Sequence, residues 1–145
     1  MTSDFAIAVH ALVYLNRHRE TISSEQLAQN VCTHPVRIRR VLAKLRKSGL
    51  VTTQEGFHGG FHFVLEADKV SLQQIAQALC EKAVDIRVRT GDLDMDCAIA
   101  SGMAAVMDGI YAQMNQACSA VLQSITLRDI DQKIFVKAGE KNGKI

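Results

Sequence analysis

A run of apolar residues at helical spacing between positions 99 and 121 is the strongest constraint on the fold. Its members follow one another at intervals of 4, 3, 4, 4, 3 and 4 residues. This pattern predicts one long helix over about residues 97–123, with a seam close to a heptad repeat. The seam consists of Ile99, Met103, Val106, Ile110, Met114, Ala117 and Val121. Residues 97–135 contain too little other structure to cover it, so we expect a second copy of the chain to do so, in a two-fold homodimer.

The first half of the chain predicts three shorter helices. Apolar residues at helical spacing indicate a helix over about residues 3–18. Ser23 or Ser24 offers an N-cap for a short second helix. A third helix follows Thr33, with Pro35 suited to its first turn. Gly49 is well placed to end that helix in a left-handed conformation.

A β-hairpin and a fourth helix are predicted next. Two β-prone runs, 50–54 and 61–65, flank a glycine-rich connection. Ser71 and Gln74 then form a capping-box pattern that opens a helix. Thr126 offers a cap for a last short helix. The expected fold is therefore mostly α with a small β-hairpin, arranged as a winged helix-turn-helix plus a long C-terminal dimerisation helix.

The expected organisation has four parts. They are a winged helix-turn-helix DNA-binding domain over residues 1–82, a loop over 83–96, the dimerisation helix and a short C-terminal helix over 97–136, and a flexible tail over 137–145.

The composition indicates a globular protein of the cytoplasm. Apolar residues make up 48% of the chain, which is enough for a core. The N-terminus has no basic region of the kind that opens a signal peptide. The apolar run over residues 5–15 is too short to cross a bilayer, so we expect no membrane partner.

Charge is distributed unevenly along the chain, and one predicted helix concentrates it. Residues 1–65 carry eight Lys and Arg against four Asp and Glu, whereas residues 66–145 carry nine against eleven. Between positions 37 and 47, six of eleven residues are basic and none is acidic. The apolar residues of this helix share one stripe, so the basic side chains occupy the rest of its surface. A basic helix after a tight turn suits the major groove of double-stranded DNA.

Position along this helix predicts the role of each side chain. Residues near its N-terminus approach base edges, where Arg pairs with guanine and Val36 suits a thymine methyl. Residues near its C-terminus hold phosphates. The candidate base contacts are Thr33, His34, Val36, Arg37, Arg39 and Arg40, and the candidate phosphate contacts are Lys44, Arg46 and Lys47. Ser24, at the start of the second helix, is a further candidate DNA contact. This hypothesis requires the basic side chains to point outward rather than into internal ion pairs.

The hairpin is predicted to act as a wing along the minor groove or flanking phosphates. Its candidate contacts are His58, Gly59 and Gly60, and its glycines permit a close approach to a backbone. The tip carries Glu55 and no Arg or Lys, which weakens electrostatic contact with DNA. An ordinary hairpin without a partner is the alternative.

Four cysteines, none closer than 17 residues to the next, predict free thiols in a reducing compartment. Cys97 and Cys32 are candidates for redox chemistry, although carboxylates beside Cys97 should disfavour its thiolate. Cys80 and Cys118 lie on apolar faces and are expected in the core. We expect no metal site and no cofactor.

Several segments together resemble the Rrf2 (Rrf-two) family of bacterial winged helix-turn-helix transcription regulators. The matching stretches are residues 24–28, 30–36, 39–51, 59–61 and 125–130, and the resemblance covers about residues 3–131. It implies a dimeric, mostly repressing DNA-binding protein with a crossed interface of long helices. It also assigns base reading to His34, Val36, Arg39 and Arg40.

The chain departs from that family pattern at two places. Glu55 stands where the family wing often has Arg. Members that sense iron–sulfur clusters carry three closely spaced cysteines before the long helix, whereas this chain has only Cys97 there. One thiolate cannot hold a cluster that needs about four ligands. The resemblance is therefore to a cysteine-poor subgroup without a cluster.

Three other functions compete with a DNA-binding regulator. One is a winged-helix protein-interaction module without DNA binding. The second is a thiol- or small-ligand-responsive sensor of the same family, whose effector the sequence does not name. The third is an enzyme, which we do not expect, because the sequence has no glycine-rich phosphate loop, no clustered carboxylates and no Ser/Cys–His constellation.

Overall fold

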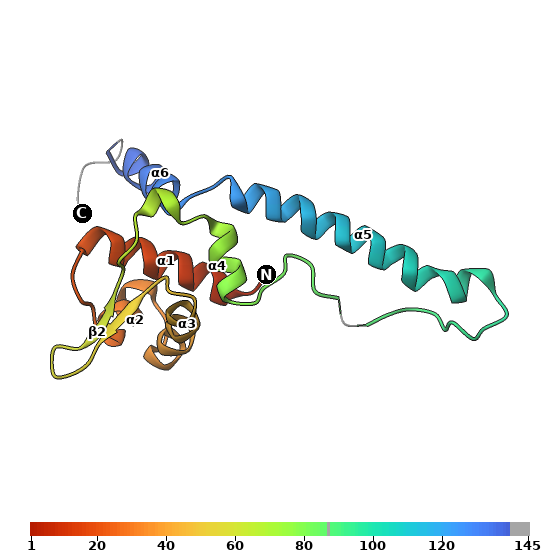
Figure 1. The fold of residues 1–145 in the computed structure, drawn as a ribbon, viewed down its shortest axis with the longest axis horizontal. Helices are drawn as coiled ribbons and strands as arrows, with labels where there is room; N and C mark the ends of the chain where they lie inside the picture. Colours follow the sequence, from red (N-terminus) through yellow and green to blue (C-terminus); the bar gives the residue numbers. More distant parts are fainter. Residues whose placement is uncertain (87, 140–145) are drawn as a thin grey trace.

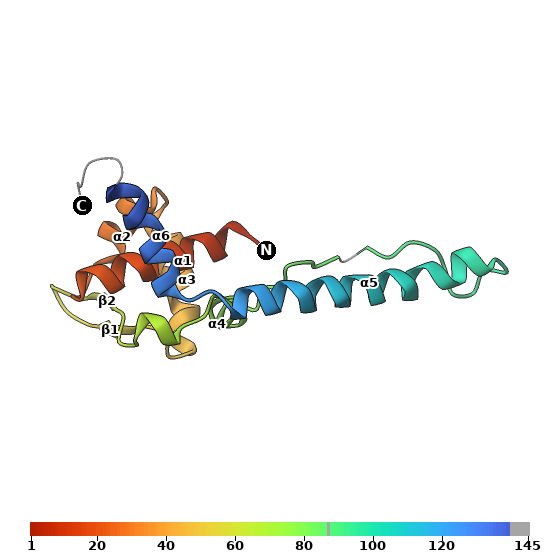
Figure 2. The same ribbon diagram turned by 90° about the horizontal axis from the view of Figure 1, so that it is seen from above.

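A computed structural model of the chain describes residues 1–86 and 88–139. Figure 1 shows a helical head with a small hairpin, from which one long helix, α5 (Ala98–Gln123), extends. Figure 2 shows the segment before α5 running outward from the head to the far end of that helix, which then returns to the head. The predicted fold class is confirmed, because the described chain is mostly helical with one two-stranded antiparallel hairpin.

The elements of the head follow the predicted order. They are α1 (Ser3–His18), α2 (Ser24–Val31), α3 (Pro35–Lys47), β1 (Thr52–Gln54), β2 (Gly60–His62), the 3-10 helix η1 (Ala67–Lys69), α4 (Leu72–Ala78) and α6 (Leu127–Gly139). Ser23, rather than Ser24, caps α2, and its partner in the capping box is Gln26. The capping box of Ser71 and Gln74 at α4 is confirmed. Gly49 has a φ of +74°, as the end of α3 requires.

The core of the head joins all of its helices. Its largest fully buried side chains include Leu12 and Leu15 of α1, Leu27 of α2, Leu42 of α3 and Phe63 after β2. Burying such side chains is the main force that fixes the angles between α1, α2 and α3. The helix-turn-helix is therefore a rigid unit.

The hairpin is shorter than predicted and is tied to the head. Thr52 pairs with His62 and Gln54 with Gly60, while Leu50, Val51 and Phe63 turn into the core. The backbones of Ile22 and Phe61 exchange two hydrogen bonds of 2.9 and 2.8 Å. The segment between α1 and α2 thus pairs with β2 through one isolated antiparallel β-bridge.

Helix α6 returns from the end of α5 and packs on the head. Leu127 is buried in the core, and Arg17 of α1 pairs with Asp131 at 2.7 Å. The same guanidinium lies 3.5 Å from the ring centre of Phe135. Helix α6 continues to Gly139, into the segment predicted as a flexible tail, and the flexibility of that tail stays a prediction; residues 140–145 lie outside the described residues. The division of the chain at residues 82 and 97 stays a prediction.

Among the described residues, no helix is both long and apolar enough to cross a membrane.

Candidate nucleic-acid interface

The apolar stripe of α3 is completely buried, and this fixes where its charges lie. Ile38, Val41, Leu42 and Leu45 have no solvent-exposed surface in the head. Each of these residues faces α1, α2 or α4, because α3 contacts all three. The six basic residues must therefore occupy the remaining surface of the helix, which the head presents to solvent (Figure 1).

The tight turn before α3 is set by local hydrogen bonds. Cys32 ends α2 in the left-handed region, with a φ of +56°, and Thr33 N donates to Ala28 O at 2.9 Å. His34 is the N-cap of α3, and its Nδ1 accepts from Val36 N at 3.2 Å. Sequence reasoning assigned His34 to base contact alone, so its capping role is an addition. Only its Nε2 edge remains for a ligand.

Val36 is an exposed apolar residue on the first turn of α3. Its side chain has no place in the core, and 57% of the residue is exposed. It lies next to the half-buried Thr33 and Arg37 on the outer side of the turn. This is the position at which a helix in the major groove approaches base edges.

Two of the candidate base-reading arginines converge on one carboxylate. Asp4, in the first turn of α1, accepts from Arg37 Nε at 2.8 Å and from Arg40 Nη2 at 3.0 Å. Ser3 Oγ also accepts from Arg37. Partial burial raises the pKa of Asp4, but the hydrogen bond from Arg37 and the charges of Arg40 and Arg37 outweigh burial, so the pKa lies below its ordinary value.

Arg39 is held on the other side of α3 by residues of α2. Its Nη1 donates to Glu25 Oε1 at 3.0 Å and to Ser24 Oγ at 2.9 Å. Ser24 is buried beneath this pair, so a role for it in DNA binding would act through Arg39. The backbone N–H of Glu25 and the Ser24 hydroxyl lower the pKa of the Glu25 carboxyl.

These contacts modify the expectation that all the arginines are free of internal ion pairs. Arg37, Arg39 and Arg40 are each paired, but their side chains remain 36%, 50% and 62% exposed. Ion pairs at such exposure contribute only about 0–1 kcal/mol, so phosphates or guanine edges can replace them. The pairs hold the guanidinium groups in place rather than removing them from the surface.

The C-terminal end of α3 carries the unpaired charges. Lys44, Arg46 and Lys47 are exposed, and within the described part of the chain none of them lies in an ion pair. Arg46 Nη1 donates weakly to Thr53 Oγ1, at 3.4 Å, which links α3 to the hairpin. These three side chains are available for phosphates.

The hairpin tip is a tight turn with an aromatic residue at its end. Gly59 N donates to Gly56 O at 2.9 Å, so Phe57 and His58 are the two central residues of the turn. A Cβ on Gly60 would lie 2.3 Å from Ile22 O, so only glycine permits this close approach. Phe57 is 99% exposed. Sequence reasoning named His58, Gly59 and Gly60 and missed both Phe57 and Asp4.

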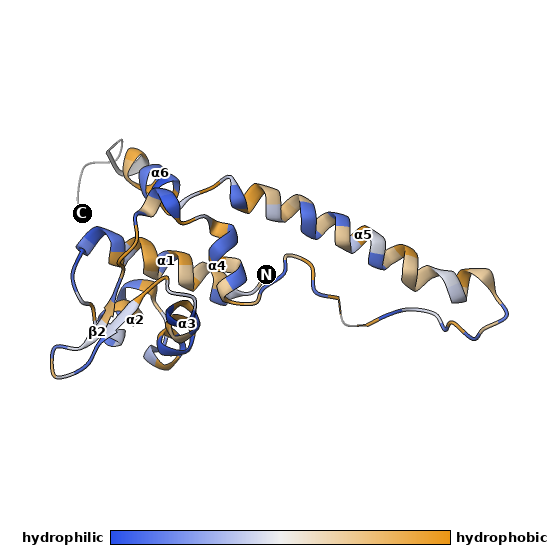
Figure 3. Ribbon diagram, in the orientation of Figure 1, coloured by the Kyte–Doolittle hydropathy of each residue, from blue (hydrophilic) through white to orange (hydrophobic). Residues whose placement is uncertain are grey.

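The seam of α5 is exposed along its whole length. No residue of α5 is buried, and all seven seam residues, from Ile99 to Val121, are exposed. Figure 3 shows hydrophobic residues recurring along this helix after it leaves the head. The opposite face of α5 packs on α4 and the N-terminus, so the seam points away from the chain's own head.

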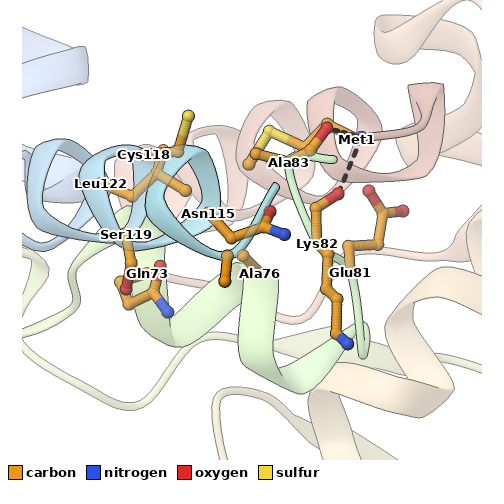
Figure 4. Close-up of a pocket in the computed structure, with 11 residues that line it drawn as sticks. Met1, Gln73, Ala76, Glu81, Lys82, Ala83, Asn115, Cys118, Ser119 and Leu122 are labelled. Atoms are coloured by element: carbon orange, nitrogen blue, oxygen red, sulfur yellow. Dashed lines mark hydrogen bonds between the residues drawn. The ribbon is translucent and has the colours of Figure 1, made fainter. Parts of the chain in front are cut away.

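A cavity of about 350 Å³ lies where α5 joins the head (Figure 4). Asn115 closes one side of it, because its side chain accepts from Val84 N and donates to Val84 O, both at 2.9 Å. The N-terminal ammonium closes another side by donating to Lys82 O and Ala83 O. Cys118 and Ser119 line the wall formed by α5.

The cysteines differ from their predicted environments at three positions. Cys80 is exposed and Cys118 half-buried, so neither belongs to the core as expected. Cys97 is exposed at the N-terminus of α5, where the backbone N–H groups of Ala100 and Ile99 lower the pKa of its thiol. The expectation that the Cys97 thiolate is disfavoured is therefore wrong in direction, because hydrogen bonds from these backbone N–H groups favour the charged form of the thiol.

Comparison with known proteins agrees with this geometry. The family model described as "Rrf2: Iron-dependent Transcriptional regulator" matches residues 1–133. The "Putative HTH-type transcriptional regulator YwnA" of Bacillus subtilis (strain 168) is 26% identical over 135 residues, which is 93% of this chain and 99% of YwnA. A crystal structure of a "putative transcriptional regulator" from Lactobacillus plantarum has a TM-score of 0.82 and 26% identity, covering 97% of this chain and 99% of that one. IscR of T. potens shares the fold, with a TM-score of 0.67 and 20% identity, covering 100% of this chain and 92% of IscR.

The iron in that family description does not fit the residues of this chain. The segment between α4 and α5 contains two cysteines, Cys80 at its start and Cys97 at its end, and Cys32 and Cys118 lie on other elements. Within the described residues, no group of three or more His, Cys, Asp or Glu side chains is placed to hold a metal ion. A cluster needs about four ligands, which this segment does not supply.

Proposed function

This chain belongs to the Rrf2 family of transcriptional regulators, and from this premise we propose that it is a homodimeric repressor of the cytoplasm. In this proposal the dimer binds a near-palindromic DNA operator, with one α3 in the major groove of each half-site. The family and the related proteins are regulators rather than enzymes. The observation that carries the proposal is the burial of the whole apolar stripe of α3, which leaves six basic side chains on the outside.

The placement of the side chains on α3 supports a division of labour on DNA. Val36, Arg37 and Arg40 lie toward the N-terminal end of the helix, which approaches base edges in a helix-turn-helix. Lys44 and Lys47 lie at the opposite end, unpaired within the described residues, and bind phosphates that fix the register. Arg39 and Arg46 complete the surface on either side.

The exposed seam of α5 supports the homodimer. Ile99, Met103, Val106 and their fellow seam residues form an apolar face about 23 residues long, which a monomer leaves in water. Two copies packed seam to seam remove this face from solvent and relate the heads by a two-fold axis. Two α3 helices related in this way match half-sites about one helical turn apart, which is the origin of the near-palindrome. Repression follows when the bound dimer blocks a promoter.

The oligomeric state and the footprint test this proposal together. Light scattering of the wild-type protein should give twice the mass of the chain, and Ile110→Lys should give the monomer mass, because a charge at the seam stays unpaired on burial. Gln116→Lys is the matched control, since Gln116 is exposed on α5 but lies off the seam. Footprinting should show two protected half-sites for wild type and Gln116→Lys, and none for Ile110→Lys at the same concentration. A monomeric wild type, or a single protected half-site, would contradict the proposal.

The cavity at the base of α5 favours ligand sensing as a second candidate function. It lies between the head and the proposed dimerisation helix, so a molecule bound there would change the angle between α5 and α4 (Figure 4). The test is a screen of small metabolites for a shift in melting temperature. A genuine ligand gives a shift that Ser119→Leu abolishes, because the leucine fills the cavity, while Ser101→Leu, an exchange elsewhere on α5, leaves the shift intact.

A further inference from the structure

We propose that Phe57 at the wing tip is a DNA-contacting residue that inserts its ring into the minor groove beside each half-site. This inference rests on the proposed function, because it names how the second element of the interface meets the same duplex. In this proposal the wing contacts DNA through an apolar ring instead of through the cationic side chains expected of a wing.

The exposure of Phe57 sets it apart from the other aromatic residues. The chain has seven Phe and Tyr residues, all of them within the described part of the chain, and Phe57 is the only one that is exposed. At 99% exposure its ring contributes nothing to the core. Figure 1 shows the hairpin projecting from the side of the head that carries α2 and α3. A ring at this position can contact the same duplex that α3 contacts.

The turn fixes the backbone from which the ring projects. Gly56 has a φ of +108°, and a Cβ on Gly59 would lie 2.5 Å from Gln54 O, so the tip accepts side chains only at its two central residues. The rings of Phe57 and His58 meet edge to face, with their centroids 5.1 Å apart. A tip whose backbone is already ordered loses little backbone freedom on binding, which favours insertion of the ring between base pairs.

The charges of the hairpin disfavour a wing that binds phosphates through cationic side chains. Residues 52–62 contain Glu55 and no Lys or Arg. Such a tip offers phosphates no Lys or Arg side chain, and an apolar wedge is another means by which proteins engage the minor groove. Insertion is easiest at pyrimidine–purine steps, which unstack readily, so we expect the wing to favour such a step at the edge of the operator.

Tryptophan fluorescence tests the position of the ring. The chain has no Trp, so Phe57→Trp supplies a single reporter at the tip. Its emission should be quenched when a 30-base-pair duplex, selected by the wild-type protein from a random pool, is added. Leu93→Trp is the matched control, because Leu93 is 75% exposed in the segment before α5, and its emission should not change. An unchanged emission for bound Phe57→Trp overturns the inference.

The salt dependence of binding tests the chemistry of the contact. Phe57→Ala should weaken binding to the selected duplex by at least about tenfold, as expected for one stacked ring. The slope of log affinity against log salt should stay that of the wild type, since an apolar ring releases no counterions. Leu93→Ala should match the wild type in both respects. Unchanged melting temperatures for both variants show that the head is intact.

The outcomes distinguish a failure of this inference from a failure of the proposed function on which it rests. Affinity within twofold of wild type for Phe57→Ala, or a loss with an altered salt slope, overturns the wedge while the DNA-binding function stands. A wild-type protein that selects no duplex from the pool overturns both.

Discussion

Asp4 Oδ1 lies 2.7 Å from Arg37 Nη2, which ties the first turn of α1 to the first turn of the proposed recognition helix. The two residues are 33 positions apart in the sequence, and Arg40 binds the second oxygen of the same carboxylate. Only 13% of the Asp4 side chain is exposed, whereas Arg37 and Arg40 keep an outward edge. The carboxylate therefore orients two guanidinium groups without covering them.

The first prediction concerns stability and its pH dependence. Asp4→Asn should lower the free energy of unfolding by about 1 kcal/mol at pH 7, because it removes charged hydrogen bonds to both arginines. The folded pKa of Asp4 lies below its ordinary value of 3.8, so its stabilisation is present above that value and is lost as pH falls through the folded pKa. Urea unfolding of both proteins at pH 7 and pH 3 measures this. The difference in the free energy of unfolding between wild type and Asp4→Asn should shrink at pH 3. An equal difference at both pH values would contradict this prediction.

The second prediction concerns discrimination between DNA sequences. Asp4→Asn removes a negative charge from the interface and frees two guanidinium groups from their fixed orientation. Affinity for a random duplex should therefore rise by a few fold, and the preference for the selected operator over random DNA should fall. Parallel titrations with the two duplexes give the ratio. A variant that discriminates as well as the wild type would show that the Asp4 contacts do not orient the arginines.

The third prediction concerns the attachment of the wing. Gly60→Ala should destabilise the protein by more than about 2 kcal/mol, because a Cβ there meets backbone atoms of Ile22 that cannot move independently. Gly109→Ala is the control, since nothing lies within 4 Å of its Cβ inside α5. Alanine there should stabilise the helix by about 0.5–1 kcal/mol. Thermal unfolding of both variants measures the shift in melting temperature, which should be negative for Gly60→Ala and positive for Gly109→Ala. Two shifts of the same sign would contradict this description of the packing.

The fourth prediction concerns the reactivity of Cys97. Backbone N–H groups at the start of α5 lower the pKa of this exposed thiol. Iodoacetamide should therefore label Cys97 at a rate that reaches half its maximum at a lower pH than for a free cysteine peptide. Peptide mass spectrometry over pH 6–10 gives the profile, with Cys97→Ser as the blank. A half-maximum at or above that of the peptide would contradict the assignment.

Local patterns predicted most of the fold from the sequence. The stripe of α1, the capping box of Ser71 and Gln74 and the φ of Gly49 depend on residues within one or two helical turns, so spacing and residue type suffice to find them. The fully buried stripe of α3 was predicted in the same way.

What the sequence did not predict depends on contacts across the chain. Nothing near Asp4 indicates that it meets Arg37, because the pairing follows from the angle at which α1 crosses α3. The position of α6 depends on Arg17 and Asp131, which are 114 residues apart. Phe57 was overlooked because an apolar residue inside a polar turn has no periodicity, although its isolation among glycines and polar residues was a visible signal.

The salt dependence of binding to the selected duplex, measured for wild type and for Lys47→Ala, tests the central claim most directly. The claim is that two symmetry-related α3 helices present their unpaired basic side chains to DNA. Lys133→Ala on α6 is the matched control, because this exposed lysine belongs to the helix that packs on α1 and η1. If Lys47 contacts one phosphate in each half-site, its removal should reduce the slope of log affinity against log salt by about 1.8, and Lys133→Ala should leave the slope unchanged. A wild-type affinity that does not change with salt concentration would contradict the claim. A slope of log affinity against log salt that Lys47→Ala leaves unchanged would contradict it as well.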